Sequence, residues 1–183
     1  MALATGLMIG PLTLKPLAMA DSAAFWQHIE QNRAIYQDTI PFVSGTHTLG
    51  QLEQLLTANL AKQAQNEAQF YGLWHGTEMA GYLLVREINP QARWAEIGYM
   101  LGQQWHGQGI ITKACQLLID DLFDVSAMDK IALCCNDNNH ASIAVAKRLG
   151  FTLEGTLRQY FVVNQVRRNM CCFGLLREEW QQS

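Results

Sequence analysis

The spacing of apolar residues in the first third of the chain predicts one short strand followed by two helices. Residues 12–17 alternate between apolar and polar side chains, as a half-buried strand does. Polar cap residues precede a helix that we expect from Asp21 to about Arg33. Leucines recur at helical spacing over residues 49–60 and predict the second helix. We expect residues 34–47 to be a loop and residues 1–10 a flexible tail.

The period then changes to that of strands. Residues 68–74 and 79–86 are strand-like runs, and the four residues between them predict a hairpin turn. A third run covers residues 93–101 and leads into a glycine-rich turn. These three segments are therefore expected to lie side by side in one sheet.

The last third alternates between helices and strands. A helix follows the glycine-rich turn, with Ile110, Ala114, Leu118 and Leu122 on one face. The further elements that we expect are a strand over 130–135, a helix over 139–149 that ends at Gly150, and strands near 151–157 and 169–177. This order predicts an α/β (α+β) fold, with a mixed sheet of about seven strands flanked by about four helices.

Length and composition agree with one globular domain over residues 1–183. Hydrophobic residues make up 49% of the chain, which excludes a disordered protein, and the net charge of −3 argues against a nucleic-acid-binding protein. Residues 18–20 look like a leader cleavage site, but no Lys or Arg precedes them and no apolar run is long enough to span a membrane. We therefore expect a cytoplasmic protein that does not bind membranes.

The cysteines do not form a metal-binding pattern. There are five, an odd number with no C-x-x-C spacing, so neither a disulfide framework nor a zinc site is predicted. We expect free thiols in a reducing compartment. The five are Cys115, Cys134, Cys135, Cys171 and Cys172.

The densest chemical signal is the turn over residues 102–109, which joins the strand at 93–101 to the next helix. Gly107 and Gly109 allow positive φ and close approach of a ligand to the backbone. The first amides of a helix lack intrahelical partners, so this turn suits an anion such as a pyrophosphate. A plain strand-to-helix turn explains the glycines equally well. The spacing fits neither a P-loop nor a dinucleotide-binding fingerprint.

A second polar group follows the strand at 130–135. Asn139 and Ser142 lie where a helix should begin, at the carboxyl end of that strand. Ligands bind at this end of strands in open α/β sheets. Asn139 would also be accounted for by capping the helix without any ligand.

Together, the two constellations make nearly the whole chain, from about residue 12 to 180, resemble the GNAT superfamily of acetyl-CoA-dependent N-acetyltransferases. Within it, the chain is most similar to the RimJ/RimL-type ribosomal-protein N-terminal acetyltransferases. The segments that carry the resemblance are 95–99, 107–112, Asn139 with Ser142, 149–151 and 154–155.

The resemblance implies acetyl-CoA as cofactor and gives it a set of contacts. The pantetheine arm should run along the backbone of Met100 and Leu101, as an added strand does. Asn139 should reach the pantetheine or the product thiolate. The family's Q/R-x-x-G-x-G/A pattern falls on His106, Gly109 and Ile111, with His and Ile as departures. The residues expected to hold the pyrophosphate are His106, Gly107, Gln108, Gly109, Ile110, Ile111 and Thr112.

The resemblance also implies direct attack of an amine on the thioester, with a base and an acid supplied by the protein. The tyrosine that many family members use as the acid falls on Ala146, so that acid is missing and Ser142 is our candidate substitute. Glu96 is the candidate base, directly or through water. A capping or surface serine and a structural carboxylate remain alternatives. Covalent catalysis by Cys134 is not favoured, because no histidine motif accompanies it.

The acceptor is the least determined part of the function. We expect the N-terminal α-amine of a protein, most simply a ribosomal one, and a homodimer is possible. A small-molecule amine such as a polyamine, aminoglycoside or amino acid is an alternative, and so is a non-catalytic acyl-CoA-binding module. A basic group of Arg158, Arg167 and Arg168 would recognise an acidic peptide, or would simply be the solvated tip of a hairpin.

Overall fold

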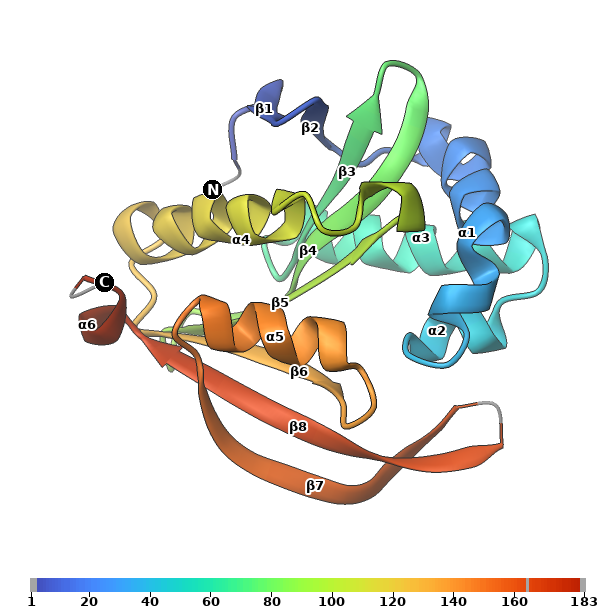
Figure 1. The fold of residues 1–183 in the computed structure, drawn as a ribbon. Helices are drawn as coiled ribbons and strands as arrows, with labels where there is room; N and C mark the ends of the chain where they lie inside the picture. The colour runs from blue at the N-terminus through green and yellow to red at the C-terminus, as the bar shows by residue number, and fades with distance from the viewer. Residues whose placement is uncertain (1–2, 164, 182–183) are drawn as a thin grey trace.

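The computed structural model describes residues 3–163 and 165–181, which form one eight-stranded sheet with helices on both faces (Figure 1). The strands are β1 (Leu7–Ile9), β2 (Leu12–Pro16), β3 (Gln69–His75), β4 (Glu78–Asn89), β5 (Trp94–Leu101), β6 (Lys130–Asn136), β7 (Thr152–Val163) and β8 (Val166–Leu176). The helices are α1 (Ser22–Tyr36), α2 (Pro41–Gly45), α3 (Leu49–Ala64), α4 (Ile110–Asp120), α5 (His140–Arg148) and α6 (Arg177–Trp180). Short 3₁₀ turns cover Met19–Asp21 and Gln103–Trp105, and a π-helical turn, Asp121–Val125, extends α4.

The strand order is β1-β2-β3-β4-β5-β6-β8-β7, and all neighbours are antiparallel except β5 and β6. β5 pairs with β4 along its whole length. Its pairing with β6 covers only Trp94–Ile97 against Lys130–Leu133. The two central strands therefore separate after Ile97, while β6 stays paired with β8 as far as Asn136.

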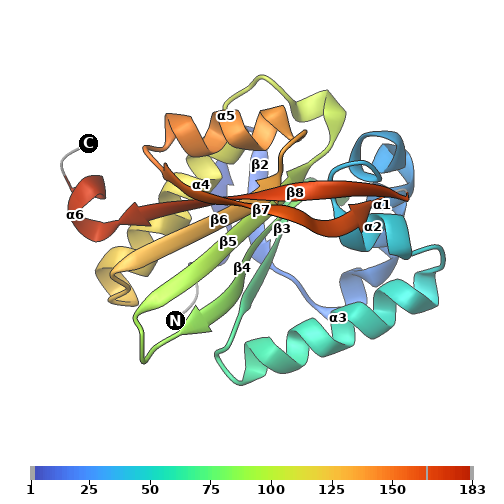
Figure 2. The same ribbon diagram turned by 90° about the horizontal axis from the view of Figure 1, so that it is seen from below.

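The helices cover the two faces of the sheet and give it two hydrophobic cores. α4 and α5 lie on one face, and α1, α2 and α3 lie on the other (Figure 2). Alternation along β5 divides its side chains between them, because Ile97 packs in the first core and Met100 in the second. A slip of one residue in β5 would exchange these two sets, so burial on both faces fixes its register.

The fold class and most predicted elements are confirmed, and the sheet has eight strands where about seven were expected. The tail predicted over residues 1–10 is wrong for Leu7–Ile9, which form β1, and residues 1 and 2 lie outside the described part. The Leu3 amide donates to the Tyr71 hydroxyl at 2.9 Å, which holds the preceding segment as well.

The predicted loop over residues 34–47 is partly helical. α1 continues to Tyr36, and α2 begins at Pro41, whose fixed φ suits the first position of a helix. None of the helices within residues 3–163 and 165–181 is long and apolar enough to cross a membrane.

A buried histidine joins α1 to the sheet. His28 is 2% exposed, and its ring nitrogens contact the Met79 carbonyl at 2.9 Å and the Tyr36 hydroxyl at 2.8 Å. The carbonyl can only accept, so Nδ1 carries the proton and Nε2 accepts from Tyr36. Burial lowers the pKa of His28 from 6.5 to about 4, although the bond to Met79 opposes this shift.

Because His28 is buried in its neutral form, we expect the protein to lose stability in mild acid. The folded protein keeps His28 neutral, whereas the unfolded chain protonates it below pH 6.5, so its contribution is lost as the pH falls from 6.5 toward 4. Between pH 7 and pH 5 the free energy of unfolding should fall by about 2 kcal/mol through this group. Urea unfolding at both pH values should show a smaller fall in His28→Gln. An equal fall in both proteins would contradict the prediction.

Candidate active site

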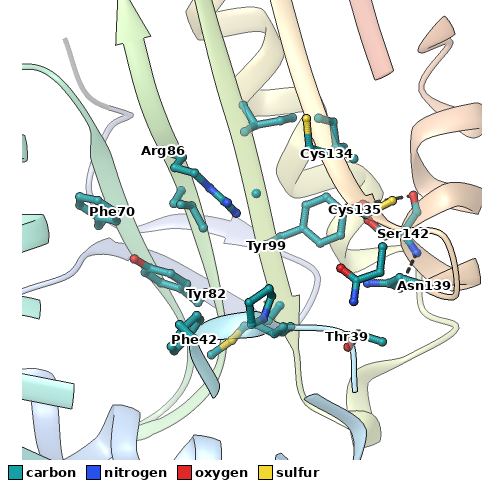
Figure 3. Close-up of a pocket in the computed structure, with 18 of the residues that line it drawn as sticks. Thr39, Phe42, Phe70, Tyr82, Arg86, Tyr99, Cys134, Cys135, Asn139 and Ser142 are labelled. Carbon is teal, nitrogen blue, oxygen red and sulfur yellow. Dashed lines mark hydrogen bonds between the residues drawn. The ribbon is translucent and has the colours of Figure 1, made fainter. Parts of the chain in front are cut away.

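A cavity of about 340 Å³ opens where β5 and β6 separate. Its walls come from both helical layers and from the hairpin of β7 and β8. Figure 3 shows Tyr99, Cys135, Ser142 and Asn139 gathered on one side of it, and Phe42, Phe70 and Tyr82 on the other.

The end of β5 offers this cavity an unpaired strand edge. Beyond Ile97, no strand in the described residues pairs with the side of β5 that faces β6. Met100 lines the cavity, and Leu101 follows it. The structure thus leaves room for an extended chain beside the two residues predicted to bind pantetheine.

The glycine turn lies between this strand edge and α4. Gly107 and Gly109 have φ of 75° and 72°, the left-handed region that disfavours other residues, and nothing lies within 4 Å of the position of a Cβ on either. Gly109 is the N-cap of α4, and its carbonyl accepts from Lys113 at 3.0 Å. The amides before Lys113 precede the first helical hydrogen bond, as an anion site requires.

The other predicted residues of the turn contribute in different ways. Ile110 and Ile111 are buried in the core beneath α4, so only their amides can serve a ligand. His106 Nε2 lies 2.9 Å from the Leu101 carbonyl and ties the turn back to β5. The Gln108 side-chain Nε2 donates to the Gln104 backbone carbonyl at 3.1 Å.

Thr112 holds Arg148 beside the glycine turn, a contact that the sequence analysis did not predict. Its hydroxyl accepts a hydrogen bond from Arg148 Nη1 at 3.0 Å. Arg148 is the last residue of α5, so the contact joins the ends of two helices that the sequence places 36 residues apart. The guanidinium adds positive charge beside the open amides.

Asn139 and Ser142 lie together on the cavity wall at the start of α5. Asn139 is the N-cap, and its Oδ1 accepts from the Ser142 amide at 3.1 Å, which confirms the capping interpretation. The amide nitrogen of Asn139 is not used in this bond. Ser142 is 7% exposed, and its Oγ lies 2.8 Å from the Tyr99 hydroxyl.

Tyr99 is the main residue that sequence reasoning missed. Alternation places it on the face of β5 opposite Glu96, but its ring reaches the cavity because β6 has diverged at that level (Figure 3). Burial raises the pKa of the Tyr99 phenol well above its usual range, so the hydroxyl stays protonated. Ala146, which takes the place of the missing family tyrosine, is fully buried in the core.

Glu96 lies beside the cavity, not in its lining. Its carboxylate is 3.5 Å from Arg86 Nε, and its side chain is 17% exposed. Burial raises the pKa of this carboxyl, and the Arg86 charge opposes the shift.

The cysteines on the wall are thiols at neutral pH. Burial raises the pKa of Cys134 to about 12 and that of Cys135 to about 11. A thiol with so high a pKa is a poor nucleophile, which agrees with the expectation against covalent catalysis.

Comparison with known proteins identifies the family. Residues 11–152 match the family described as "Acetyltransferase (GNAT) domain". The chain belongs to the GNAT acetyltransferase family. Among solved GNAT structures, RimL, described as a ribosomal L7/L12 alpha-N-protein acetyltransferase in complex with coenzyme A, superimposes with a TM-score of 0.87 at 25% identity. That superposition covers 94% of this chain and 98% of RimL.

Curated GNAT relatives are named for two kinds of acceptor. The chain is 34% identical over 110 residues to the putative ribosomal N-acetyltransferase YdaF of Bacillus subtilis (strain 168). It is also 34% identical over 112 residues to a spermidine N(1)-acetyltransferase of Escherichia coli (strain K12). Each match covers 60% of this chain and 60% of the relative, less than two thirds of either relative's length.

The cavity fits the cofactor of the family. GNAT acetyltransferases use acetyl-CoA, and solved relatives hold coenzyme A or acetyl-CoA. Here the open space at Gly107 and Gly109 admits a phosphate to the amides of the turn. The unpaired edge of β5 suits an extended pantetheine, because its backbone groups lack a strand partner.

Proposed function

We propose that the protein transfers the acetyl group of acetyl-CoA to a primary amine, most directly to the N-terminal α-amine of a protein, with a ribosomal protein as the first candidate. The observation that carries the proposal is the cavity at the separation of β5 and β6, which Ser142 lines. The open helix amides at Gly109 lie outside the lining of this cavity, at the turn that follows β5. The match to RimL over 94% of the chain supports the same acceptor class.

Acetyl-CoA would supply the thioester that a neutral amine attacks without a covalent enzyme intermediate. The amides over residues 107–112 would hold its pyrophosphate, and β5 beyond Ile97 would align its pantetheine. Asn139 has an amide nitrogen left over from capping, and that nitrogen would donate to the pantetheine or to the product thiolate.

Ser142 is our candidate for the acid that protonates the leaving thiolate. The N-terminus of α5 stabilises negative charge near this hydroxyl. Tyr99 stays protonated and can donate to Ser142 Oγ, which would allow a relay through both hydroxyls. Ser142 also hydrogen-bonds the Cys135 thiol, so its proton has a second partner on the cavity wall (Figure 3).

Glu96 is our candidate base, acting through water past Arg86. We expect Glu96→Gln to lower kcat about 100-fold, the usual contribution of general base catalysis. The base must be ionised and its pKa is raised, so wild-type kcat/KM should fall as the pH drops through that raised pKa. The variant should lack this limb of the pH profile.

Steady-state kinetics from pH 5 to 9 test this, with Glu78→Gln as control because Glu78 is exposed at the start of β4. A rise in acceptor KM at unchanged kcat would show that Glu96 only orders Arg86.

The function itself is tested first by thermal unfolding with and without acetyl-CoA. Ligand at about 100 times its dissociation constant should raise the melting temperature by roughly 5–10 °C, unlike adenosine diphosphate or NAD. Release of free thiol with N-terminal peptides then measures transfer. No stabilisation at saturating acetyl-CoA would contradict the proposal. Stabilisation without thiol release from any amine would favour the non-catalytic module.

A further inference from the structure

The charged side chains that line the cavity are all cations in the described part of the chain. They are Lys62 of α3 and Arg86 of β4. Arg86 reaches over β5, where its Nη2 lies 3.3 Å from the position of a Cβ on Gly98 (Figure 3). Because Gly98 has no side chain, the Arg86 guanidinium has room to lie over β5 at the cavity. No described carboxylate forms an ion pair with Lys62.

A third cation lies on the hairpin that closes the same side. Arg168 of β8 is the cross-strand partner of Phe161, and it is two residues from Met170; both of these residues line the cavity. Residues two apart on a strand share a face, so Arg168 faces the cavity side. Its Nε is buried without a hydrogen-bond partner. Buried guanidinium nitrogens are normally paired, so this one indicates a place for an acceptor group from a ligand.

The hairpin that carries Arg168 is held firmly in place. The next residue, Asn169, accepts from the Gln159 amide at 2.9 Å and donates to Asp137 at 2.8 Å. These bonds tie β8 both to β7 and to the segment after β6. The position of Arg168 beside the cavity is therefore set by backbone and side-chain bonds on its neighbour.

We propose that the acceptor is an N-terminal polypeptide segment that carries carboxylates directly after its reactive amine, an inference that rests on the proposed acetyl transfer. Lys62 and Arg86 line the cavity, and Arg168 lies on the hairpin next to two lining residues. Of the described carboxylates near them, Glu96 pairs with Arg86 and Asp137 accepts from Asn169. The three cations come from α3, β4 and β8, so an extended segment with several carboxylates engages them better than one small anion does. A polyamine would bring like charge into this cation cluster and is disfavoured.

The proposal is tested with short peptides of equal length that share an N-terminal serine and differ only in the next three residues: aspartates, glutamines or lysines. The aspartate peptide should have a kcat/KM about 10-fold above the glutamine peptide, and the lysine peptide should fall below both. This preference should shrink at high ionic strength, since charge interactions are screened. Free glutamate and spermidine, assayed alongside, should be poorer acceptors than the aspartate peptide.

Variants that each remove one positive charge show which cations produce the preference for the aspartate peptide. Arg168→Gln and Lys62→Gln should each reduce the aspartate-to-glutamine ratio several-fold, mainly through acceptor KM. Lys15→Gln is the control, because Lys15 is exposed on β2 and does not line the cavity, so its loss should leave the ratio unchanged. Two separate variants keep the test valid if one of them fails to fold.

Equal kcat/KM values for the aspartate and lysine peptides would overturn the proposal, but the proposed acetyl transfer would stand. A higher kcat/KM for spermidine than for the aspartate peptide would have the same consequence. If free glutamate had a kcat/KM equal to that of the aspartate peptide, the acceptor would not need to be a polypeptide, and that part of the proposal would be overturned. If no peptide is acetylated, the affinities of the three peptides are measured on protein saturated with coenzyme A. Tighter binding of the aspartate peptide supports the proposal, and equal affinities overturn it. Failure of acetyl-CoA to bind would instead remove the proposed function.

Discussion

Replacement of Gly109 by tryptophan is expected to reduce the affinity for acetyl-CoA more than about 100-fold, because the indole would cover the amides that serve the pyrophosphate. The Cβ position of Gly109 has nothing within 4 Å, so the protein itself has room for the side chain. The substitution should therefore weaken acetyl-CoA binding and leave the fold in place. A tryptophan at the left-handed φ of this position costs only about 1–2 kcal/mol of strain in the folded protein. Isothermal titration measures the affinity.

Gly76→Trp is the matched control for this prediction. Gly76 has φ of 61° and equally open surroundings, but it lies in the turn between β3 and β4. The same strain at this position should leave acetyl-CoA affinity unchanged. If Gly109→Trp bound acetyl-CoA as tightly as Gly76→Trp, the glycine turn would not be the pyrophosphate site.

Removal of the Ser142 hydroxyl should have the second large effect. Ser142→Ala is expected to lower kcat about 100- to 1,000-fold, within the range of general acid catalysis, while acetyl-CoA affinity changes little. The variant also leaves the Tyr99 hydroxyl without its 2.8 Å partner, so it should lose about 1–3 kcal/mol of stability. Assays must run well below its melting temperature, with single-turnover kinetics separating chemistry from binding.

Tyr99→Phe distinguishes a relay from a lone serine. It keeps the Ser142 hydroxyl and its bond to Cys135 and removes the Tyr99 hydroxyl, so kcat should fall about 10-fold, less than in Ser142→Ala. Ser126→Ala serves as control, since Ser126 bonds to Asp121 and neither residue lines the cavity. Wild-type kcat in Ser142→Ala would remove this serine as the acid.

Local pattern predicted the elements that bury a periodic face. The helix with leucines from Leu49 to Leu60 is of this kind. The strands β3 and β4 were instead predicted from apolar runs, which are buried on both faces of the sheet. β1 is only three residues long, so no period could reveal it; it is held by pairing with β2 and by the burial of Ile9. The helical part of residues 34–47 is likewise stabilised by packing of Val43 against α1 and α3 in the second core.

For the site, sequence reasoning placed Asn139 and Ser142 together and identified the glycine turn. It could not find Tyr99, because a strand's alternation predicts which face a side chain takes but not that the neighbouring strand has moved away. Arg148 was missed for a similar reason, since its contact with Thr112 joins two helix ends by tertiary packing. The roles given to Glu96 and Ser142, and the homodimer, remain predictions.

The early separation of β5 from β6 has an evolutionary consequence. The groups that would hold the cofactor belong to the turn before α4, to β5 and to the start of α5, whereas the cations that would select the acceptor belong to α3, β4 and β8. Mutations in the second set can accumulate without disturbing the first. A gene duplicate of this protein could therefore acquire a new acceptor by charge reversals at Lys62 and Arg168, with its acetyl donor and the Arg86–Glu96 pair unchanged.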